Sequence, residues 1–486
     1  MKPTERTIAL SFAAIFILAG LLLLPYPGIQ NDEAMFASPL YPPHFAVYKF
    51  RGVPIMWMDY VGCLKTWIYA GIFAIFPPSP WSLRLPVILI GALSIYLFST
   101  LLTRLGGVRC ACIGGTLLVT DPVFALTNNF DWGPVALQHF LLIAGLLAAM
   151  QFHRVRHTRW LAIAAFSFGL GLWDKALFIW LLVPICFAAL LLWPHAVRSA
   201  LTLRNITAAC GAFTLGAAPL LWFNVTHQWV TFRSHTVFSL AELPAKLKVL
   251  HWTANGSVLF DYMVQGPKRA DLLEYALALA VLALPFLWNT EVRKPALFSL
   301  LVMASAWAQM ALNRDTGGGA HHTVLLWPLP QLLIAVVFAK LRWFGPAATA
   351  VVALSSLLVY HQYWSNFRTE GPSLTWTDAL PQLATDPALA EANAVCIIDW
   401  GIVDPLIVLR KGRLPLRAGT PEALAFYVNQ PNTLWVSHLT GQELIPGINT
   451  RLFALATAQG YRLQPGRIYN DHHGHPVYQL FKFLQH

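Results

Sequence analysis

The stretch 7-TIALSFAAIFILAGLLLL-24, followed closely by 31-NDEAMFA-37, decides the fold class of this chain. The first segment has no charged residue and approaches the roughly 20 apolar residues that cross a bilayer. It lacks a small-residue cleavage site, so we expect an uncleaved signal anchor. Two adjacent carboxylates, Asp32 and Glu33, follow at the mouth of this first predicted membrane span.

The composition indicates that lipid solvates most of the chain. Of 486 residues, 57% are hydrophobic and only 11% are charged, whereas soluble domains carry about 25% charged residues. The net charge of +11 comes from short basic clusters between apolar runs rather than from a basic stripe. We therefore expect a membrane partner and no nucleic acid.

Hydrophobic runs predict a mainly α, polytopic membrane protein. Candidate spans are 7–24, 85–103, 109–127, 133–152, 160–173, 176–193, 205–223, 271–288, 296–312, 323–340 and 343–361. We therefore expect about 11 transmembrane helices.

The positions of Lys and Arg predict the orientation of these spans. With Lys2 and Arg6 in the cytoplasm, every predicted inner loop is basic. These loops carry Arg104 and Arg109; Arg154, Arg156 and Arg159; Arg198 and Arg204; Arg293 and Lys294; and Lys340 and Arg342. A span at 61–76 would reverse this pattern, so we expect an interfacial helix there, with Trp67 and Tyr69 at the membrane surface.

Three outer segments follow from this topology: 25–84, 224–270 and 362–486. The last contains the strand-like runs 394-AVCIID-399, 433-TLWVSH-438 and 477-VYQLFKF-483 between turn residues. We expect a transmembrane catalytic domain at 1–361 and a small extracytoplasmic α/β domain at 362–486.

Charged residues of both signs gather on the predicted outer face. Asp32, Glu33 and Asp131 lie in outer loops, and Lys65 and Arg84 lie near the level of the lipid headgroups. Each has a simpler explanation, because Asn31 or Asp32 could cap a short helix near Ala34 and the cations could snorkel. Together they suit a reaction that needs a base for an attacking hydroxyl or amine and positive charge for a departing lipid phosphate.

Three short elements carry a resemblance to a known family. They are the D-E pair after the first helix, the R-L-P at residues 84–86 that opens the next span, and Asp131 in the following outer loop. The stretches 54-PIMWMDYVGCLKTWIY-69, 131-DWGPVALQH-139 and 173-WDKALF-178 extend it. The chain resembles bacterial glycosyltransferase family 39 of the GT-C class, whose relatives include protein O-mannosyltransferases and lipid A aminoarabinose transferases.

The resemblance implies a reaction and a site. Such enzymes transfer a sugar from a polyprenyl-phosphate carrier, with inversion at the anomeric carbon. It implies Asp32 as the general base, Glu33 and Asp131 as groups that position the acceptor or a metal, and Arg84 with Lys65 as contacts for the donor phosphate.

Other polar groups complete the predicted site. Lys175, beside Asp174 at an outer helix end, is either a local ion pair or a further contact for the donor phosphate. In the Gly-rich loop 313-NRDTGGGAHH-322, we expect His321 and His322 to line the substrate. Adjacent histidines rarely chelate one ion, and 471-DHHGHP-476 reads as a hairpin turn, so we assign no metal ligand, although a divalent cation remains a possible cofactor.

We thus predict a multi-pass inner-membrane glycosyltransferase with a cytoplasmic N-terminus, a polyprenyl-phosphate sugar donor and an extracytoplasmic acceptor. The alternatives are a secondary transporter or lipid flippase, and an inactive membrane scaffold. No nucleotide-binding motif occurs. Transporter sites sit near the bilayer midplane, whereas the distinctive charges here gather at one surface.

Overall fold

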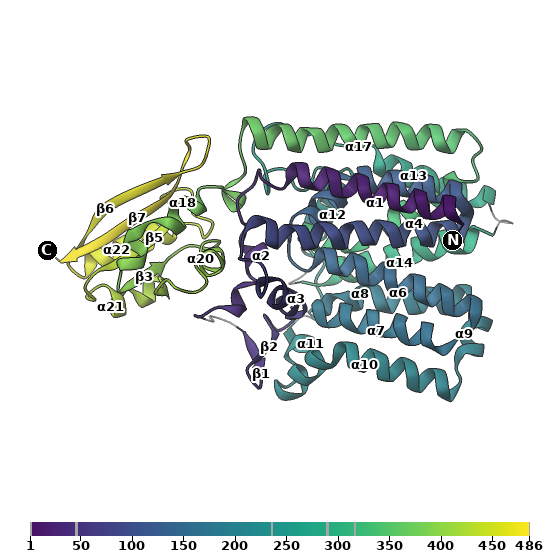
Figure 1. Cartoon of the computed structure of the whole chain (residues 1–486), viewed down its shortest axis with the longest axis horizontal. Coiled ribbons are helices and arrows are strands. Elements are labelled where there is room, and N and C mark those ends of the chain that lie inside the picture. Colours follow the sequence, from purple (N-terminus) through teal and green to yellow (C-terminus); the bar gives the residue numbers. More distant parts are fainter. Residues whose placement is uncertain (1, 44–46, 235–236, 288–290, 315–316, 486) are drawn as a thin grey trace.

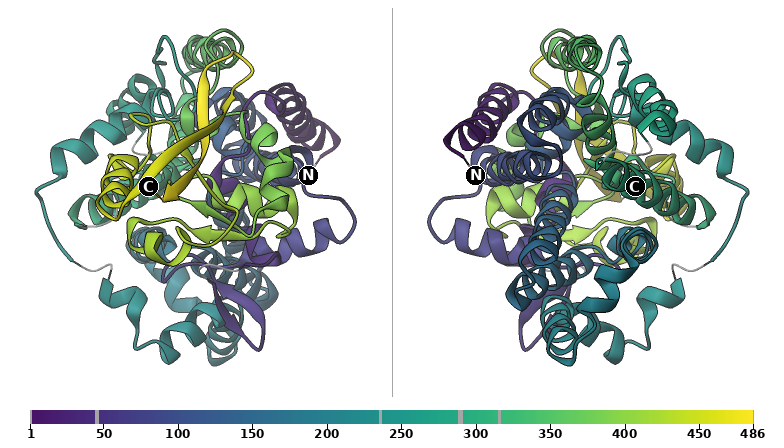
Figure 2. Two further views of the ribbon diagram at one scale, coloured as in Figure 1. Left: turned by 90° about the vertical axis from the view of Figure 1, so that its left-hand side faces the viewer. Right: turned by 90° about the vertical axis from the view of Figure 1, so that its right-hand side faces the viewer.

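A bundle of long helices carries a smaller sheet domain at one end (Figure 1). The computed structural model describes residues 2–43, 47–234, 237–287, 291–314 and 317–485. The N-terminus lies at the end of the bundle away from the sheet domain (Figure 1). Figure 2, viewed along the long axis, shows that the sheet domain covers the end of the helix bundle opposite to the N-terminus.

Seven helices of the described ranges are long and apolar enough to cross a membrane. They are α1 (Pro3–Leu23), α4 (Pro80–Thr120), α6 (Val135–Val155), α10 (Leu203–Thr226), α14 (Arg293–Leu312), the segment Ala320–Phe338 and α17 (Phe344–Thr369). The segment Ala176–Leu192 forms an eighth if it is joined to α9 (Pro194–Ala200), which is bent away by 108°. The multi-pass helical fold is confirmed, but the predicted count of eleven spans is not.

Helix α4 contains both of the spans predicted at 85–103 and 109–127. Its backbone leaves the helical region at Gly107, where φ is 77°. The side chains of Leu102 and Phe98 lie against Gly114. In a straight helix these positions would be about 18–24 Å apart, so the two halves of α4 fold back on each other at Gly107.

The remaining helices of the bundle are shorter. They are α2 (Asn31–Ala34), α3 (Leu64–Phe73), α5 (Pro122–Asn129), α7 (Thr158–Asp174), α8 (Ile179–Leu192), α11 (Val230–Ser234), α12 (Leu243–Ala254), α13 (Leu273–Ala283), α15 (Ala320–Thr323) and α16 (Leu329–Phe338). A hairpin of β1 (Tyr48–Phe50) and β2 (Val53–Met56) projects from the first outer loop. The 3-10 turns are η1 (Ser38–Leu40), η2 (Ala176–Phe178), η3 (Leu284–Leu287) and η4 (Val324–Leu326).

Helix α3 occupies the segment that we expected at the membrane interface. Its 10 residues span about 15 Å, too short for a hydrocarbon core of about 30 Å, so it is not a membrane span. Trp67 is 44% exposed, but Tyr69 is 2% exposed. The prediction that Tyr69 faces the membrane surface is wrong, because its hydroxyl donates to Asp131 inside the protein.

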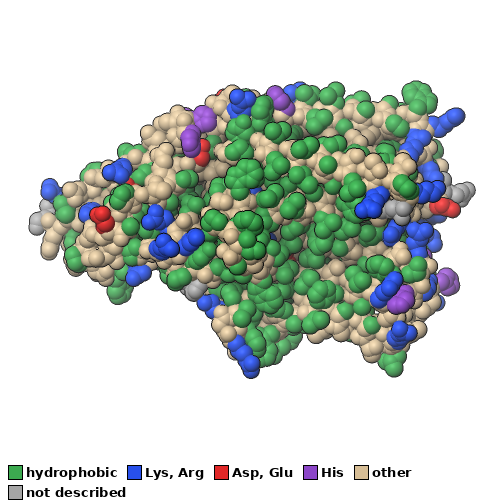
Figure 3. Space-filling model, viewed as in Figure 1, with side chains coloured by type: hydrophobic (Ala, Val, Ile, Leu, Met, Phe, Trp, Pro, Cys, Tyr) green, Lys and Arg blue, Asp and Glu red, His purple; other side chains and the backbone are tan. Residues whose placement is uncertain are grey.

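Basic loops meet at the end of the bundle away from the sheet domain. Arg104 donates to Gln151 at 2.8 Å, and Arg156 donates to Ser199 at 3.1 Å. Figure 3 shows Lys and Arg side chains gathered at that end and a broad hydrophobic surface over the middle. The basic residues of these loops therefore lie at one end of the bundle, as the predicted membrane topology requires. That this end faces the cytoplasm stays a prediction.

The C-terminal part contains the expected sheet. Its strands β3 (Ala394–Ile397), β4 (Leu416–Ala418), β5 (Thr433–His438), β6 (Tyr461–Asn470) and β7 (Pro476–Gln485) follow the order β4-β3-β5-β7-β6. Strand β3 is parallel to β4 and β5, and β7 is antiparallel to β5 and β6. All three predicted strand segments and the predicted hairpin turn before β7 are confirmed.

Helices cover both faces of this sheet. They are α18 (Leu380–Thr385), α19 (Pro387–Glu391), α20 (Val403–Arg410), α21 (Leu424–Tyr427) and α22 (Ile448–Ala458), with the short turns η5 (Leu374–Trp376) and η6 (Pro421–Ala423). Val395 packs with Leu406 of α20 on one face, and Cys396 packs with Leu452 of α22 on the other. This alternation is what a strand buried on both faces requires.

The sheet domain touches the bundle at the first outer loop. Helix α20 contacts α2 and η1, and Ser38 donates a hydrogen bond of 2.6 Å to Asp404. The expected domain boundary after residue 361 falls within α17, which continues to Thr369. The sheet domain is thereby placed directly above the loop that carries Asp32.

Candidate active site

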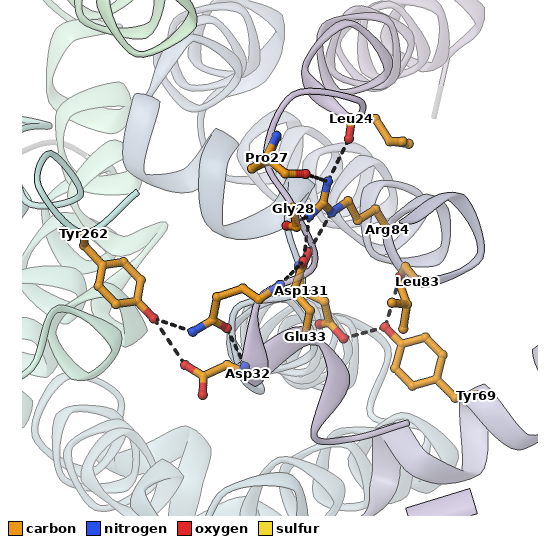
Figure 4. Close-up of polar contacts among 11 residues, drawn as sticks. Leu24, Pro27, Gly28, Asp32, Glu33, Tyr69, Leu83, Arg84, Asp131 and Tyr262 are labelled. Atoms are coloured by element: carbon orange, nitrogen blue, oxygen red, sulfur yellow. Dashed lines mark hydrogen bonds and ion pairs between the residues drawn. The ribbon is translucent and has the colours of Figure 1, made fainter. Parts of the chain in front are cut away.

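The acidic pair lies on the four-residue helix α2. Its N-cap is Gln30, whose side-chain oxygen accepts from the backbone N–H of Asp32, while the backbone N–H of Gln30 donates to the Glu33 carboxylate at 3.1 Å. The cap is thus Gln30, and not Asn31 or Asp32 as the simpler prediction had it. Successive helical residues point about 100° apart, so Asp32 and Glu33 face different surroundings (Figure 4).

Glu33 faces the interior and binds Arg84. The guanidinium Nε and Nη2 donate to the two carboxylate oxygens at 2.8 and 2.7 Å. Arg84 Nη1 donates to the carbonyls of Leu24 and Pro27 at 2.7 and 3.0 Å, and Nη2 donates to Gly28 at 2.6 Å. We call Glu33, Arg84 and these three carbonyls the Arg84 cluster (Figure 4).

The Arg84 cluster leaves no donor for a substrate. A guanidinium has five N–H groups, and five protein acceptors bind them. Arg84 and Glu33 are both 0% exposed. Arg84 thus caps the carbonyl end of α1 and fixes the loop after it, and its contact with a donor phosphate stays a prediction. Glu33, predicted to position an acceptor or metal, is likewise taken up by protein groups.

Asp131 forms a second buried group with Lys65. The Lys65 ammonium donates to the Asp131 carboxylate and to the carbonyl of Gly133. It also lies 3.9 Å from the ring centroid of Phe36. The second carboxylate oxygen of Asp131 accepts from Tyr69, and its backbone N–H donates to Glu33 at 3.1 Å.

This arrangement changes the expected parts of Lys65 and Asp131. Lys65 is 5% exposed and Asp131 is 1% exposed, and the partners just described occupy both side chains. Asp131 therefore holds Lys65 instead of facing a substrate. Lys65 contributes its positive charge to the site, because that charge favours the ionised form of Asp32, but its hydrogen bonds are directed at the protein.

Asp32 differs from all of these groups. Its side chain is half-buried, and Oδ2 accepts from the Tyr262 hydroxyl at 3.4 Å. Figure 4 shows it pointing toward Tyr262 and away from Arg84. Burial raises the pKa of Asp32, while the Tyr262 hydroxyl, the charges of Lys65 and Lys175 and the Trp132 side chain work in the opposite direction. A half-buried carboxylate with a raised pKa suits a general base.

Lys175 supplies an uncommitted positive charge. It is 2% exposed, and in the described ranges no hydrogen-bond acceptor binds its ammonium group. Burial lowers its pKa to about 8, and the negative charges of Asp174 and Asp32 partly offset this effect. A buried ammonium without a partner is costly, so Lys175 is poised to gain from an anionic ligand. Its position fits the predicted contact with the donor phosphate.

The two histidines predicted to line the substrate have different surroundings. His321 presents its ring to that of Trp132 at a centroid distance of 5.8 Å, which places it beside Asp32. The Nδ1 atom of His322 accepts from the backbone of Gly317 and Gly319, so His322 holds the Gly-rich loop. The part of this loop at 315–316 lies outside the described residues. We call Asp32, Trp132, Lys175, Tyr262 and His321 the Asp32 site.

The described residues offer no group of three or more His, Cys, Asp or Glu side chains that could hold a metal ion. Nothing in the described arrangement thus points to a metal, and a divalent cation stays a prediction from the resemblance.

Sequence reasoning missed three groups at Asp32. Trp132 could have been suspected, because it directly follows Asp131. Gln30 precedes the acidic pair by two residues but carries no chemical signature. Tyr262 lies in the outer segment 224–270, far away in the sequence, and no motif marks it. Only the tertiary structure brings its hydroxyl to Asp32.

Comparisons with known proteins give a partial match to a family profile and a shared fold. The sequence profile of the dolichyl-phosphate-mannose-protein mannosyltransferase family matches residues 62–223, about a third of the chain. No curated protein matches the chain in sequence.

The fold is that of ArnT from Cupriavidus metallidurans, whose crystal structure contains bound undecaprenyl phosphate. The two structures share a TM-score of 0.62 at 14% sequence identity, over 96% of this chain and 97% of the other. Arabinosyltransferase EmbB from Mycobacterium smegmatis aligns over 70% of this chain and 30% of its own, with a TM-score of 0.44 and 18% identity. The predicted resemblance is thus confirmed by the fold shared with ArnT and by the profile match over residues 62–223.

Proposed function

We propose that this protein is an inner-membrane glycosyltransferase that transfers a sugar from a polyprenyl-phosphate-linked donor to an extracytoplasmic acceptor, with inversion. One observation carries the proposal: Asp32, a half-buried carboxylate of raised pKa, and Lys175, a buried cation without a protein acceptor in the described ranges, lie close enough for each charge to act on the pKa of the other. These are the two groups that displacement of a lipid phosphate requires.

The proposed reaction is a direct displacement. Asp32 accepts the proton of the acceptor hydroxyl or amine as that group attacks the anomeric carbon. The bond between this carbon and the phosphate oxygen breaks, and the lipid phosphate leaves with the electron pair. Lys175 stabilises the negative charge that develops on the phosphate, and attack from the opposite side inverts the anomeric carbon. The Arg84 cluster and the pair of Lys65 with Asp131 act as positioning groups.

The comparisons support the donor class. The protein with the matching fold binds undecaprenyl phosphate, and the family profile describes enzymes that use a dolichyl-phosphate sugar. Both carriers are polyprenyl phosphates. The hydrophobic surface over the middle of the bundle (Figure 3) suits a donor that approaches from the bilayer. The sugar could be a hexose or a pentose.

A transfer assay tests the proposal. The purified full chain would be incubated with polyprenyl-phosphate hexoses and pentoses and with extracted envelope lipids and glycans as acceptors. We expect Asp32→Asn to lower kcat by about 10²- to 10⁴-fold, the usual share of a general base, without a change in thermal unfolding. Glu422→Gln, an exposed change in the sheet domain, is the matched control and should remain fully active.

Two results would overturn the proposal. Undiminished transfer by Asp32→Asn would remove this carboxylate as the base. Solute or lipid flux through reconstituted protein, together with no turnover of any donor, would favour a transporter or flippase instead.

A further inference from the structure

A pocket of about 270 Å³ lies between the first outer loop and the sheet domain. The loop contributes Ser38, Pro39 and Trp57, and the sheet domain contributes Asp404 and Ile407 of α20, among others. Apart from Ser38 and Asp404, its lining residues are apolar. Ligand sites in proteins have this character, an apolar lining with few polar groups, and the pocket is slightly smaller than the volumes of about 300–1,000 Å³ that are usual for them.

The polar groups of the pocket are incompletely paired. Asp404 Oδ1 accepts from Ser38 at 2.6 Å, and in the described part of the chain no Lys or Arg forms an ion pair with Asp404. The indole N–H of Trp57 is buried and has no hydrogen-bond partner among those residues. Buried donors are rarely left unpaired, so a ligand that accepts from Trp57 and donates to Asp404 would complete both.

The charge and shape of the pocket select a class of ligand. A carboxylate without a cation beside it repels phosphate and other anions. A ring with apolar faces and hydroxyl groups at its edge matches the pocket lining. The faces would pack on Trp57 and Pro39, and the hydroxyls would donate hydrogen bonds to Asp404. A neutral sugar has this chemistry, and the volume suits a single ring.

The pocket also lies beside the proposed base. Asp404 contacts the loop that carries α2, and its pKa is raised to about 6, first by burial and then by the negative charge of Asp32. The side chain of Asn31, the residue before Asp32, favours the ionised form of Asp404. A ligand on Asp404 is therefore one short helix away from Asp32, whereas the cation Lys175 lies within the Asp32 site itself.

We propose that this pocket binds a neutral, hydroxyl-bearing sugar ring of the acceptor, with Asp404 and Trp57 as its polar contacts. The identification of the ligand as the acceptor rests on the proposed function. The sheet domain thereby supplies one wall of the acceptor site. Donor phosphate and acceptor sugar are separated by charge, because Lys175 attracts the phosphate and Asp404 repels it.

A binding experiment with simple probes tests the pocket without any turnover. Saturation-transfer NMR on the detergent-solubilised full chain would use methyl mannoside, methyl glucoside and methyl galactoside, with mannose 6-phosphate as the anionic probe. We expect at least one neutral glycoside to bind and the phosphorylated sugar not to bind at this site. Asp404→Asn and Trp57→Phe should each weaken binding by roughly tenfold, the effect of one hydrogen bond that involves a charged or buried group.

The control is Glu391→Gln, an exposed change on the same domain, which should leave binding unaltered. Ser38→Ala offers a third probe if Asp404→Asn lowers the amount of folded protein. The pocket assignment fails if no neutral glycoside binds, or if the Asp404 and Trp57 variants bind the glycosides as the wild type does.

Kinetics separate this inference from the proposed function. In the transfer assay, Asp404→Asn should raise the KM for the acceptor about tenfold and leave the KM for the donor unchanged. Transfer with an unaltered acceptor KM in both variants overturns the inference and leaves the proposed function intact. Glycoside binding that the variants lose, in a wild-type protein that transfers no sugar, overturns the proposed function and leaves the pocket as a sugar site.

Discussion

Two cations at the same end of the bundle, Arg84 and Lys175, have opposite surroundings. Both are buried, at 0% and 2% exposure. Arg84 gives all of its hydrogen bonds to protein acceptors, whereas no acceptor in the described ranges binds the Lys175 ammonium. Burial alone therefore does not distinguish these two cations; the completeness of their hydrogen bonding does.

The adjacent carboxylates show the same contrast. Glu33 is 0% exposed and accepts from Arg84, Gln30 and Asp131. Asp32, its neighbour in sequence, is half-buried, accepts a long hydrogen bond of 3.4 Å from Tyr262 and has no ion pair among the described residues. The Arg84 cluster thus holds the loop in place, and the Asp32 site keeps capacity for a substrate. Substitutions in the two groups should therefore have different effects, on stability for the Arg84 cluster and on activity for the Asp32 site.

The largest effect is expected at the Arg84 cluster. Arg84→Ala leaves the Glu33 carboxylate buried without its partner, which typically costs about 3–5 kcal/mol of stability. Thermal or denaturant unfolding in detergent should show this loss, with Asp32→Asn unchanged as the control. The opposite result is an Arg84→Ala protein that has wild-type stability but no longer binds the donor. It would show that Arg84 contacts the donor phosphate.

Lys175→Met should separate function from stability. It removes a buried charge that has no protein acceptor in the described ranges, so the unfolding midpoint should stay level or rise. The KM for the donor should rise about 10- to 100-fold, since a hydrogen bond to a charged group contributes about 1.5–3 kcal/mol. Arg198→Met, an exposed change in α9 at the other end of the bundle, serves as the control. A lowered midpoint with an unaltered KM would make Lys175 a structural residue.

The pH dependence sharpens the assignment of Lys175. Its pKa of about 8 means that the ammonium charge is present below pH 8 and is lost as the pH rises. In the wild type, kcat/KM for the donor should therefore decline above about pH 8. Lys175→Arg should remove this decline, because an arginine stays charged beyond pH 12. A decline that persists in Lys175→Arg would assign it to another group.

The smallest effect is expected for Tyr262→Phe. The Tyr262 hydroxyl favours the ionised form of Asp32, so its removal should raise the pKa of Asp32. The acid limb of kcat/KM should move to higher pH, and the rate at the optimum should fall only about two- to tenfold. Tyr275→Phe, at an exposed tyrosine of α13, is the control. An acid limb that does not move would separate Tyr262 from the base.

The sequence predicted the architecture well where the signal is local. Apolar runs placed the membrane helices, and a strand-like run between turn residues placed β5 at Thr433–His438, which is buried along its whole length. The predicted count of eleven spans is not confirmed, and the boundary at residue 361 falls inside α17. Helix ends and kinks such as Gly107 depend on packing with other helices, which a hydrophobic run does not encode.

The sequence predicted which charged residues gather at the candidate site, but not which of them are already bound by other protein groups. The D-E pair and the outer loops brought Asp32, Lys65, Arg84, Asp131 and Lys175 to one face. Which of them faces a substrate depends on partners distant in the chain, such as the carbonyl of Gly28 for Arg84 and the hydroxyl of Tyr262 for Asp32. No sequence motif marks a backbone carbonyl as a hydrogen-bond acceptor for a distant side chain.

The sequence by itself thus determined that this chain spans a membrane, that an α/β domain follows the helices, and that charges of both signs meet at one end. Hydrophobic length and periodicity are properties of consecutive residues, so they can be read directly. Only the tertiary structure decided that protein groups take up the hydrogen bonds of Glu33 and Arg84. It also decided that Asp32 and Lys175 can still form hydrogen bonds with another group. Hydrogen-bond saturation depends on how closely distant segments approach, and that distance exists only in the folded protein.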